Sequence, residues 1–150
     1  MTMAELQSES NLKRVGYFIP AIVWTIILLT LCLAPGKDIP SIPWLNSIHF
    51  DKVVHFCLFG GFVLFWCYGI LKQENTVLFR IVLLFTLLSI SLGIAVEFMQ
   101  KYWIPDRDFE IGDMIADAAG AILAAILFSR FKEKLRNFPK ARSGKIRAGH

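Results

Sequence analysis

The sequence predicts an all-α integral membrane protein, a four-helix transmembrane bundle with both termini in the cytoplasm. Three observations lead to this prediction. Hydrophobic residues make up 55% of the 150 residues and charged residues only 19%, against about 45–50% and about 25% in ordinary soluble domains. The apolar residues are gathered in four long runs, and the basic residues lie mostly on one side of the predicted membrane. The length fits one domain.

Four apolar runs approach or reach the length that a bilayer crossing needs, which is roughly 20 residues with a range of about 17–25. They extend from Val15 to Gly36, from Val53 to Leu71, from the residue after Arg80 to Val96, and from Met114 to Ser129. His55 interrupts the second run and Asp117 the fourth, while Glu97 directly follows the third. None alternates with a period of two, as barrel strands do. We therefore expect four transmembrane helices.

Two other interpretations of these runs are weaker. A soluble four-helix bundle would keep a polar stripe on each helix, but Thr86 is the one polar residue between Ile81 and Leu88. The first run follows two basic residues, as a signal peptide would, but it is long for one, and its small-residue exit at Cys32–Ala34 is followed by Pro35. We expect the first run to remain as a membrane anchor.

The distribution of Lys and Arg predicts the orientation. With four spans both termini lie on one side, and that side carries twelve Lys and Arg, eight of them from Arg130 onward, against four on the other side. Because positive charge stays cytoplasmic, the protein is expected in the inner (cytoplasmic) membrane with both termini inside. The loops Pro35–Lys52 and Lys101–Asp113 then lie outside. Three regions result: a cytoplasmic segment 1–14, a membrane domain 15–130 and a basic cytoplasmic tail 131–150.

The net charge of +4 divides unequally between the two sides. The inner side has four acidic residues against its twelve basic ones and a net charge of +8, whereas the outer side has eight acidic residues against four basic ones and a net charge of −4. A basic tail next to a span is interpreted as a topology signal that rests on anionic lipid. We therefore expect membrane lipids, and no nucleic acid, as partners of the tail.

The three cysteines, Cys32, Cys57 and Cys67, all fall within predicted spans. No pair has the spacing of a metal-binding motif, so we interpret all three as buried apolar thiols.

Ionisable and amide side chains within the spans share one depth. His55 lies about one turn into the second helix, Glu97 and Gln100 close the third, and Asp113 and Asp117 open the fourth. With a rise of 1.5 Å per residue, all should lie within roughly 6–8 Å of the outer interface. Because such groups are costly in lipid, they usually face the bundle interior and serve a function. We expect a polar site at the outer end of the bundle.

Helical spacing supports a site with one face on each helix, because residues three or four apart are neighbours. The pairs are Asp51 with His55, Glu97 with Gln100, and Asp113 with Asp117. The small residues Ala116, Gly120 and Ala124 also form a stripe, which lets another helix approach closely. That helix belongs either to this chain or to a second copy in an oligomer.

The loop between the third and fourth helices carries further candidates. Tyr102 and Trp103 suit the membrane–water interface. Arg107 can return as a bidentate partner for Glu97 or Asp113. The complete set of candidate ligand-binding residues is Asp51, Lys52, His55, Glu97, Gln100, Arg107, Asp113 and Asp117.

Structural roles remain open for several of these residues. Asp113 could be a helix N-cap, His55 a hydrogen-bonded structural histidine, and Arg107 with Glu97 a salt bridge that fixes the loop. A histidine with carboxylates can hold a divalent ion, but the H-x-x-x-H and H-E-x-x-H patterns are absent. We expect no bound metal and no cofactor.

The polar motifs resemble those of VanZ-like membrane proteins, from about residue 15 to 130. Residues 51–56 read D-K-V-V-H-F and resemble the D-K-x-x-H-F motif of that family. Residues 97–100, 105–107 and 113–120 resemble its E-x-x-Q, P-G-R and D-x-x-x-N-x-x-G motifs. Two positions depart from the pattern: Asp106 stands where the family usually has Gly, and Asp117 where it usually has Asn.

The resemblance implies an integral membrane protein of the bacterial cell envelope. The namesake of the family is associated with low-level resistance to the glycopeptide teicoplanin. By this reading the outward polar site binds an envelope ligand, such as a lipid-linked precursor or a glycopeptide, and supports resistance or envelope homeostasis.

Two other functions compete with ligand binding. One is a membrane-embedded hydrolase or transferase that acts on a lipid-linked substrate, with His55 as general base and a carboxylate as its orienting group or acid. No Ser or Cys nucleophile accompanies His55 at the same depth. Cys57 is only two residues away, but this spacing directs it to another face of the helix. We therefore favour binding over catalysis. The other is a structural or partner-binding membrane protein without chemistry of its own.

Overall fold

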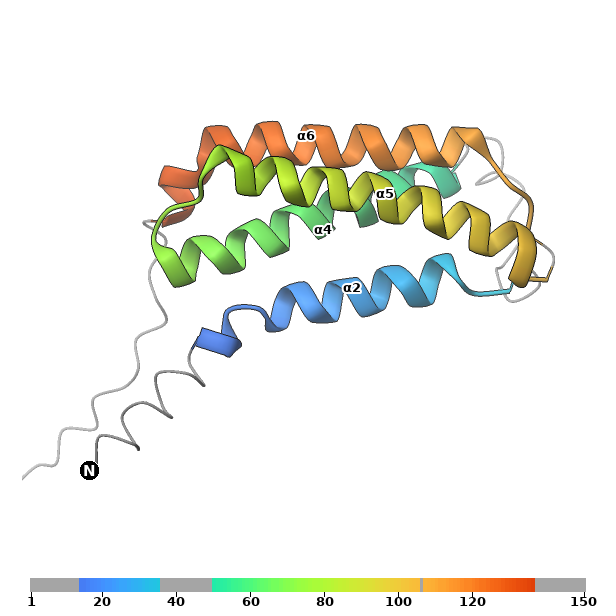
Figure 1. The fold of residues 1–150 in the computed structure, drawn as a ribbon, viewed down its shortest axis with the longest axis horizontal. Coiled ribbons are helices and arrows are strands. Elements are labelled where there is room, and N and C mark those ends of the chain that lie inside the picture. The colour runs from blue at the N-terminus through green and yellow to red at the C-terminus, as the bar shows by residue number, and fades with distance from the viewer. Residues whose placement is uncertain (1–13, 36–49, 106, 137–150) are drawn as a thin grey trace, which may run out of the picture.

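The structure of the protein, a computed structural model, describes residues 14–35, 50–105 and 107–136. Its described part is a bundle of four long helices, α2 (Ile19–Cys32), α4 (Phe50–Glu74), α5 (Phe79–Trp103) and α6 (Ile111–Arg136), with no strand (Figure 1). The all-α prediction is confirmed for these residues. The N-terminal segment up to residue 13, most of the first predicted outer loop, Asp106 and the end of the tail from residue 137 lie outside the described residues.

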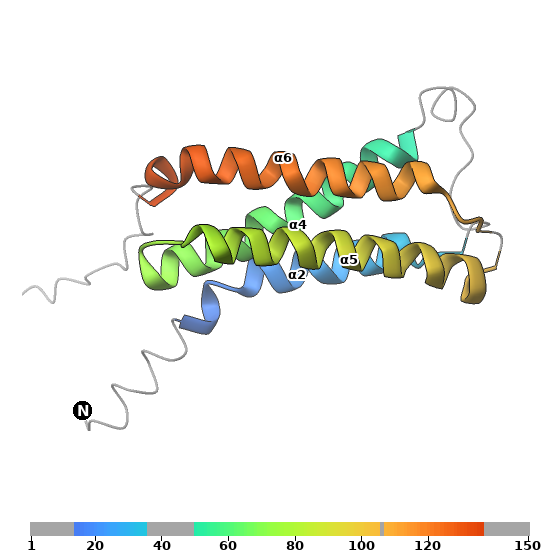
Figure 2. The ribbon, with the colours of Figure 1, turned by 45° about the horizontal axis from the view of Figure 1, so that its top comes forward.

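Four helical segments of the described chain are long and apolar enough to cross a membrane: Arg14–Cys32, Phe50–Glu74, Phe79–Trp103 and Ile111–Arg136. They contain 19 to 26 residues, or about 28–39 Å at a rise of 1.5 Å per residue, against a hydrocarbon core of about 30 Å. The prediction of four spans is therefore confirmed by length and composition. The first segment begins and the last one ends at the same end of the bundle (Figures 1 and 2), while the side that faces the cytoplasm remains a prediction.

Helix α4 is the centre of the bundle, because it packs against α2, α5 and α6. Its large buried side chains, such as Phe59, Phe62 and Val63, form a core with Leu28 of α2 and Phe128 of α6. The outer helices instead expose large apolar side chains, which suits contact with lipid. Examples are Ile22, Val23 and Ile26 on α2, Leu83, Leu84 and Leu87 on α5, and Ile122, Leu123 and Ile126 on α6.

Glycine brings α4 and α6 into backbone contact. A Cβ atom added to Gly120 of α6 would collide with the backbone of Phe56, and one added to Gly60 of α4 would lie 3.0 Å from the carbonyl oxygen of Gly120. The stripe of small residues thus admits a neighbouring helix, as its spacing predicted. That neighbour is α4 of the same chain, which buries Gly120 and Ala124. A contact between two copies through this face would require α4 to move aside.

Aromatic side chains attach α2 to α4. The indole of Trp24 donates a hydrogen bond of 2.9 Å to the carbonyl oxygen of Leu58, and it lies where Gly61 has no side chain. The indole of Trp66 donates to the hydroxyl of Thr25 at 3.2 Å and stacks on Phe85 of α5. These bonds matter because α2 has no Asp, Glu, Lys, Arg or His side chain that could fix its register.

Short connections fix how the last three helices enter and leave the bundle. Helix α4 ends at Glu74, and Asn75 follows with a φ angle of 58°. Asparagine tolerates this left-handed conformation and ends a helix in the way that glycine often does. Between α5 and α6 only residues 104–110 intervene. The end of α5 and the start of α6 are therefore held side by side (Figure 1).

Candidate ligand-binding site at one end of the bundle

Five ionisable residues from three helices meet at the end of the bundle where α4 and α6 begin and α5 ends (Figures 1 and 2). We call them the polar cluster: Lys52, His55, Glu97, Asp113 and Asp117. Four of them are buried, with exposed fractions of 0% for Glu97, 1% for Asp117, 4% for His55 and 5% for Asp113. Since ionisable groups are seldom buried without partners, the contacts of each group define what the cluster can do.

His55 lies between the two aspartates of α6. Its Nδ1 atom is 3.0 Å from Oδ1 of Asp117, and its Nε2 atom is 4.0 Å from Oδ2 of Asp113. An ionised carboxylate only accepts hydrogen bonds, so Nδ1 is the donor when Asp117 is ionised. In the neutral ring Nε2 then has a free lone pair directed toward Asp113. The ring also stacks on Phe59, which fixes its plane.

Asp117 owes its position to Gly93 of α5. A Cβ atom at Gly93 would lie 2.5 Å from Oδ2 of Asp117, so glycine provides the space that the carboxylate occupies. Oδ2 itself is buried and has no hydrogen-bond partner in the described chain. Asp117 is thus bound by His55 on one oxygen only.

Glu97 has a similar arrangement on α5. Its Oε2 atom accepts a 2.9 Å hydrogen bond from the backbone N–H of Glu110, at the start of α6. Its Oε1 atom is buried and unpartnered among the described residues. The backbone of the α5–α6 connection therefore fixes the carboxylate of Glu97 and leaves one oxygen available.

Lys52 closes the cluster on the solvent side. Its Nζ atom lies 2.6 Å from Oε2 of Glu110, 2.8 Å from Oδ1 of Asp113 and 3.3 Å from Oδ2 of Asp51. Its side chain packs over Gly112, where a Cβ atom would lie 2.8 Å from its Cε atom. The ammonium group thus neutralises part of the acidic rim.

The structure brings five of the eight predicted site residues together and places the other three at the edge or outside. Asp51 is exposed at the rim and forms an ion pair with Lys52. The amide of Gln100 donates a 2.7 Å hydrogen bond to the carbonyl oxygen of Cys32, at the end of α2, and its role in ligand binding stays a prediction. Gln100 therefore ties α2 to α5.

The expected pairing of Arg107 with Glu97 or Asp113 is wrong. No ion pair of Arg107 occurs in the described chain, and its Nε atom is buried without a hydrogen-bond partner. Glu97 already binds the N–H of Glu110, and Lys52 already binds Asp113. One oxygen of each carboxylate that Arg107 was expected to bind therefore has another donor.

Asp113 does not act as the N-cap of α6. It is the third residue of the helix, and its N–H donates to the carbonyl oxygen of Glu110, which precedes the helix. Its side chain binds Lys52 instead of the helix backbone. Glu110 is the one contact residue that the sequence analysis missed. Its position three residues before Asp113, one helical turn away, was the available signal.

The cysteines divide into two kinds. Cys32 and Cys67 are buried, as predicted, but Cys57 is exposed on the face of α4 that turns away from the core. The prediction of burial fails for Cys57 because it lies two residues from His55, so a helix that directs His55 inward turns Cys57 outward. The thiol therefore faces away from the polar cluster.

Three members of the polar cluster have the geometry of a metal site. Donor atoms of His55, Glu97 and Asp113 all lie within 4.8 Å of one another, and all three residues are buried. A second group, formed by Asp51, Glu110 and Asp113, also has donor atoms within this distance, but two of its members are exposed. Lys52 binds all three members of the second group, so its ammonium takes the place that a cation would need.

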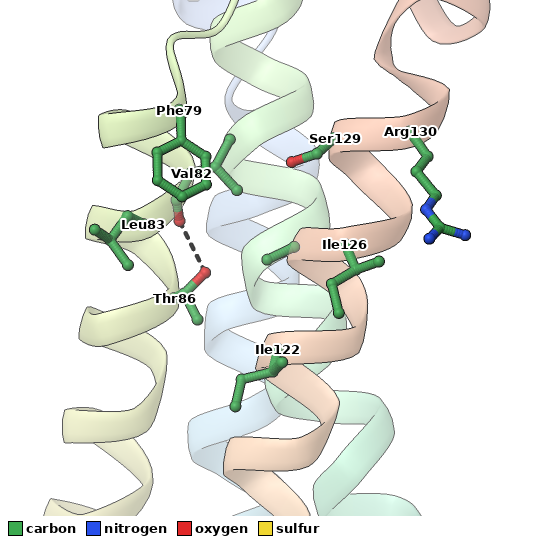
Figure 3. A pocket seen from close by; sticks show the side chains of 9 residues that line it. Phe79, Val82, Leu83, Thr86, Ile122, Ile126, Ser129 and Arg130 are labelled. Atoms are coloured by element: carbon green, nitrogen blue, oxygen red, sulfur yellow. Dashed lines mark hydrogen bonds between the residues drawn. The ribbon is translucent and has the colours of Figure 1, made fainter.

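A groove between α5 and α6 lies away from the polar cluster, toward the opposite end of the bundle (Figure 3). It has a volume of about 390 Å³ and mostly apolar walls, formed by residues such as Phe79, Val82 and Ile126. The hydroxyl of Thr86 in its wall donates to the carbonyl oxygen of Val82, and Arg130 points away from the groove. The groove offers little to a polar ligand, so the polar cluster remains the candidate site.

The fold and the site together define a class: a small multi-pass membrane protein with a buried polar cluster at one end of a four-helix bundle. The chain belongs to the VanZ/LLP1 family, whose sequence profile matches residues 5–132. This confirms the resemblance carried by the four polar motifs. Searches among curated proteins and among solved structures found no match.

Proposed function

We propose that this protein acts in the bacterial cell envelope and binds a polar envelope ligand at the polar cluster, which faces the outside of the inner membrane. The observation that carries the proposal is the pair of buried, unpartnered carboxylate oxygens, Oε1 of Glu97 and Oδ2 of Asp117. A purely structural network would be expected to satisfy such atoms, because an unsatisfied buried polar group costs about 1–3 kcal/mol, more when charged. The presence of two such atoms at one end of the bundle favours a ligand-binding role.

The ligand class follows from where the cluster lies and from the family. A site at the outer end is within reach of lipid-linked envelope precursors in the outer leaflet and of glycopeptides that arrive from outside. Lys52, with a side chain 27% exposed, provides a cationic rim to an otherwise acidic site. Membership of the VanZ/LLP1 family supports a role in susceptibility to glycopeptides such as teicoplanin. Binding, and not a reaction, is the primary role proposed.

The test separates binding from folding. Glu97→Gln and Asp117→Asn preserve shape and remove the charges, and Glu133→Gln is the matched control, because Glu133 is an exposed glutamate at the opposite end. Membrane abundance, teicoplanin susceptibility and the amounts of lipid-linked precursors are measured in cells that carry each variant. We expect unchanged abundance with an altered susceptibility or precursor level in the two cluster variants alone. Loss of abundance in proportion to phenotype would instead support a structural role.

A membrane-embedded hydrolase or transferase is the second candidate, favoured by the contact between His55 and Asp117. A histidine oriented by a carboxylate on Nδ1 can use Nε2 as a general base. Purified protein would then convert a lipid-linked precursor, and His55→Gln would abolish the conversion while His55→Gln protein remains folded. Recovery of the precursor unchanged, as mass spectrometry measures it, would exclude this activity for that substrate.

A further inference from the structure

We propose that His55, Glu97 and Asp113 bind one divalent transition-metal ion, with Asp117 as the residue that orients His55. The proposal rests on the proposed function, in that it treats the polar cluster as a binding site, and it deepens that function by naming an inorganic partner. It differs from the expectation drawn from sequence motifs, which included no metal.

Each of the three ligand residues has one atom held in place and another atom available. Asp117 holds Nδ1 of His55 at 3.0 Å, the N–H of Glu110 holds Oε2 of Glu97 at 2.9 Å, and Lys52 holds Oδ1 of Asp113 at 2.8 Å. The atoms left over are Nε2, Oε1 and Oδ2. Such a division of labour is typical of metal sites, in which outer partners orient the ligating atoms.

Distances and burial support a shared ion. Donor atoms of the three residues lie within 4.8 Å of one another, and two ligands bound to one ion at about 2.0–2.2 Å each lie at most about 4.4 Å apart. A small side-chain movement would therefore suffice to close the coordination sphere. The three residues come from three different helices, so the bundle itself sets their separation.

The unpartnered atoms provide an independent observation. Oε1 of Glu97, on a fully buried side chain, has no hydrogen-bond donor in the described chain. Glu97, which carries this atom, has a carboxylate oxygen in the same group of mutually close donors as His55 and Asp113. A cation at this point would satisfy an atom that the chain itself leaves without a partner.

The balance of charge in the polar cluster also supports a bound cation. The three buried carboxylates, Glu97, Asp113 and Asp117, face one permanent cation in the described ion pairs, which is Lys52 on Asp113. A divalent cation would balance the remaining two negative charges at the place where they meet. The second acidic group does not compete for the ion, because Lys52 already binds Asp51, Glu110 and Asp113 from the rim.

The donor set narrows the choice of metal. One imidazole with two carboxylates suits Zn²⁺, Mn²⁺ or Fe²⁺ better than Mg²⁺ or Ca²⁺, which prefer oxygen ligands alone. Three protein ligands also leave at least one coordination position open, as in sites where a metal binds an exogenous group. A phosphate or carboxylate oxygen of an envelope ligand could occupy this position despite the acidic surroundings.

The experiment measures metal in the full chain, purified in lipid nanodiscs without chelator. Elemental analysis should find about one equivalent of Zn²⁺, Mn²⁺ or Fe²⁺ per chain in the unmodified protein, and His55→Gln and Glu97→Gln should lose it. Glu133→Gln, at the opposite end, is the control and should retain the metal. Asp117→Asn should weaken binding by about 10–100-fold.

A second measurement keeps the proposal testable if a variant folds poorly. Co²⁺ added to chelator-treated protein should give visible absorption bands typical of mixed nitrogen and oxygen ligands, and Zn²⁺ should displace it. Absence of the bands together with absence of bound metal from the unmodified protein would overturn the proposal, as would full retention of metal by folded Glu97→Gln.

The outcomes also separate this proposal from the proposed function. Bound metal without any change of susceptibility or precursor level in the variants would support the metal site and contradict ligand binding. Changed susceptibility in folded variants of a protein that binds no metal would support ligand binding and contradict the metal site.

Discussion

The two ends of the bundle differ in how their charged side chains are hydrogen-bonded. At the end opposite the polar cluster, Lys72 donates a 3.1 Å hydrogen bond to the carbonyl oxygen of Leu135, near the last residue of α6, and Lys132 donates to that of Val77. These cations bind carbonyl groups that helices and turns leave free, which is favourable at a helix C-terminus. At the polar cluster, Glu97 and Asp117 each keep an oxygen without a partner.

The difference indicates where function lies. At the basic end, Lys72 and Lys132 bind backbone carbonyl groups, and Arg136 forms an exposed pair with Glu133. The polar cluster is completed only in part, although its groups are more deeply buried. A region that keeps buried carboxylate oxygens without partners, in spite of the cost, is a better candidate for binding than one whose lysines bind backbone carbonyl groups.

The orientation of the two ends gives an all-or-none prediction. In a background without native cysteines, Asp108→Cys next to the polar cluster should react with an impermeant thiol reagent in intact spheroplasts. Lys134→Cys at the basic end should react only after permeabilisation, because positively charged ends remain cytoplasmic. Both residues are exposed, so accessibility within the protein is matched. The reverse labelling pattern would place the polar cluster in the cytoplasm.

The contact between α4 and α6 should give the largest effect on stability. Gly120→Val puts a branched side chain against the backbone of Phe56, which cannot move without shifting α4. Overpacking of this kind costs about 3 kcal/mol or more, and thermal unfolding in detergent measures it. Gly16→Val is the control, because no atom lies within 4 Å of a Cβ atom at Gly16. Equal stability of both variants would contradict the close approach of the two helices.

Removal of Lys52 should have a smaller effect, restricted to the polar cluster. Lys52→Met leaves the buried carboxylate of Asp113 without its cation, and partial exposure of Lys52 limits the expected loss to about 1–2 kcal/mol. Adding Asp113→Asn should recover most of the lost stability. Unfolding curves recorded in the presence of chelator measure this recovery. Strictly additive effects of the two changes would show that the pair is not coupled.

The exposed pair at the basic end should have the smallest effect. Glu133 and Arg136 approach to 2.8 Å one turn apart, but their side chains are 64% and 43% exposed. Exposed helical pairs contribute about 0.3–0.5 kcal/mol or less. Glu133→Gln should therefore leave the unfolding temperature within about 1–2 °C of the original value. A shift as large as that of Lys52→Met would remove the proposed contrast between the ends.

Much of the fold could be predicted because lipid demands long apolar helices and their number follows from the runs. Helix ends were less accurate: Glu97 and Gln100 were expected to close the third helix, whose apolar run ends at Val96, but α5 continues to Trp103. The polar residues after Val96 remain helical because Glu97 is buried against α6 and Gln100 against α2. Polarity marked the end of the run but did not end the helix.

The members of the site were predictable, and their partners were not. Helical spacing and common depth were sufficient to group His55, Glu97, Asp113 and Asp117. Which donor meets which oxygen depends on how the helices are rotated against one another, which no single-helix pattern contains. For that reason Arg107 was expected to bind Glu97 or Asp113, whereas the backbone of Glu110 binds Glu97 and Lys52 binds Asp113.

The position of the polar cluster also bears on how the chain enters the membrane during synthesis. His55, Glu97, Asp113 and Asp117 all lie within about 9 Å of a helix end, at 1.5 Å per residue. A charged group at the middle of a span opposes insertion by about 2.5–3.5 kcal/mol, and the penalty falls toward the interface. The short connection 104–110 lets α5 and α6 insert as one hairpin, which carries Glu97 and Asp113 together. The carboxylates of the buried site thus lie near one end of their helices, where a charged group opposes insertion least.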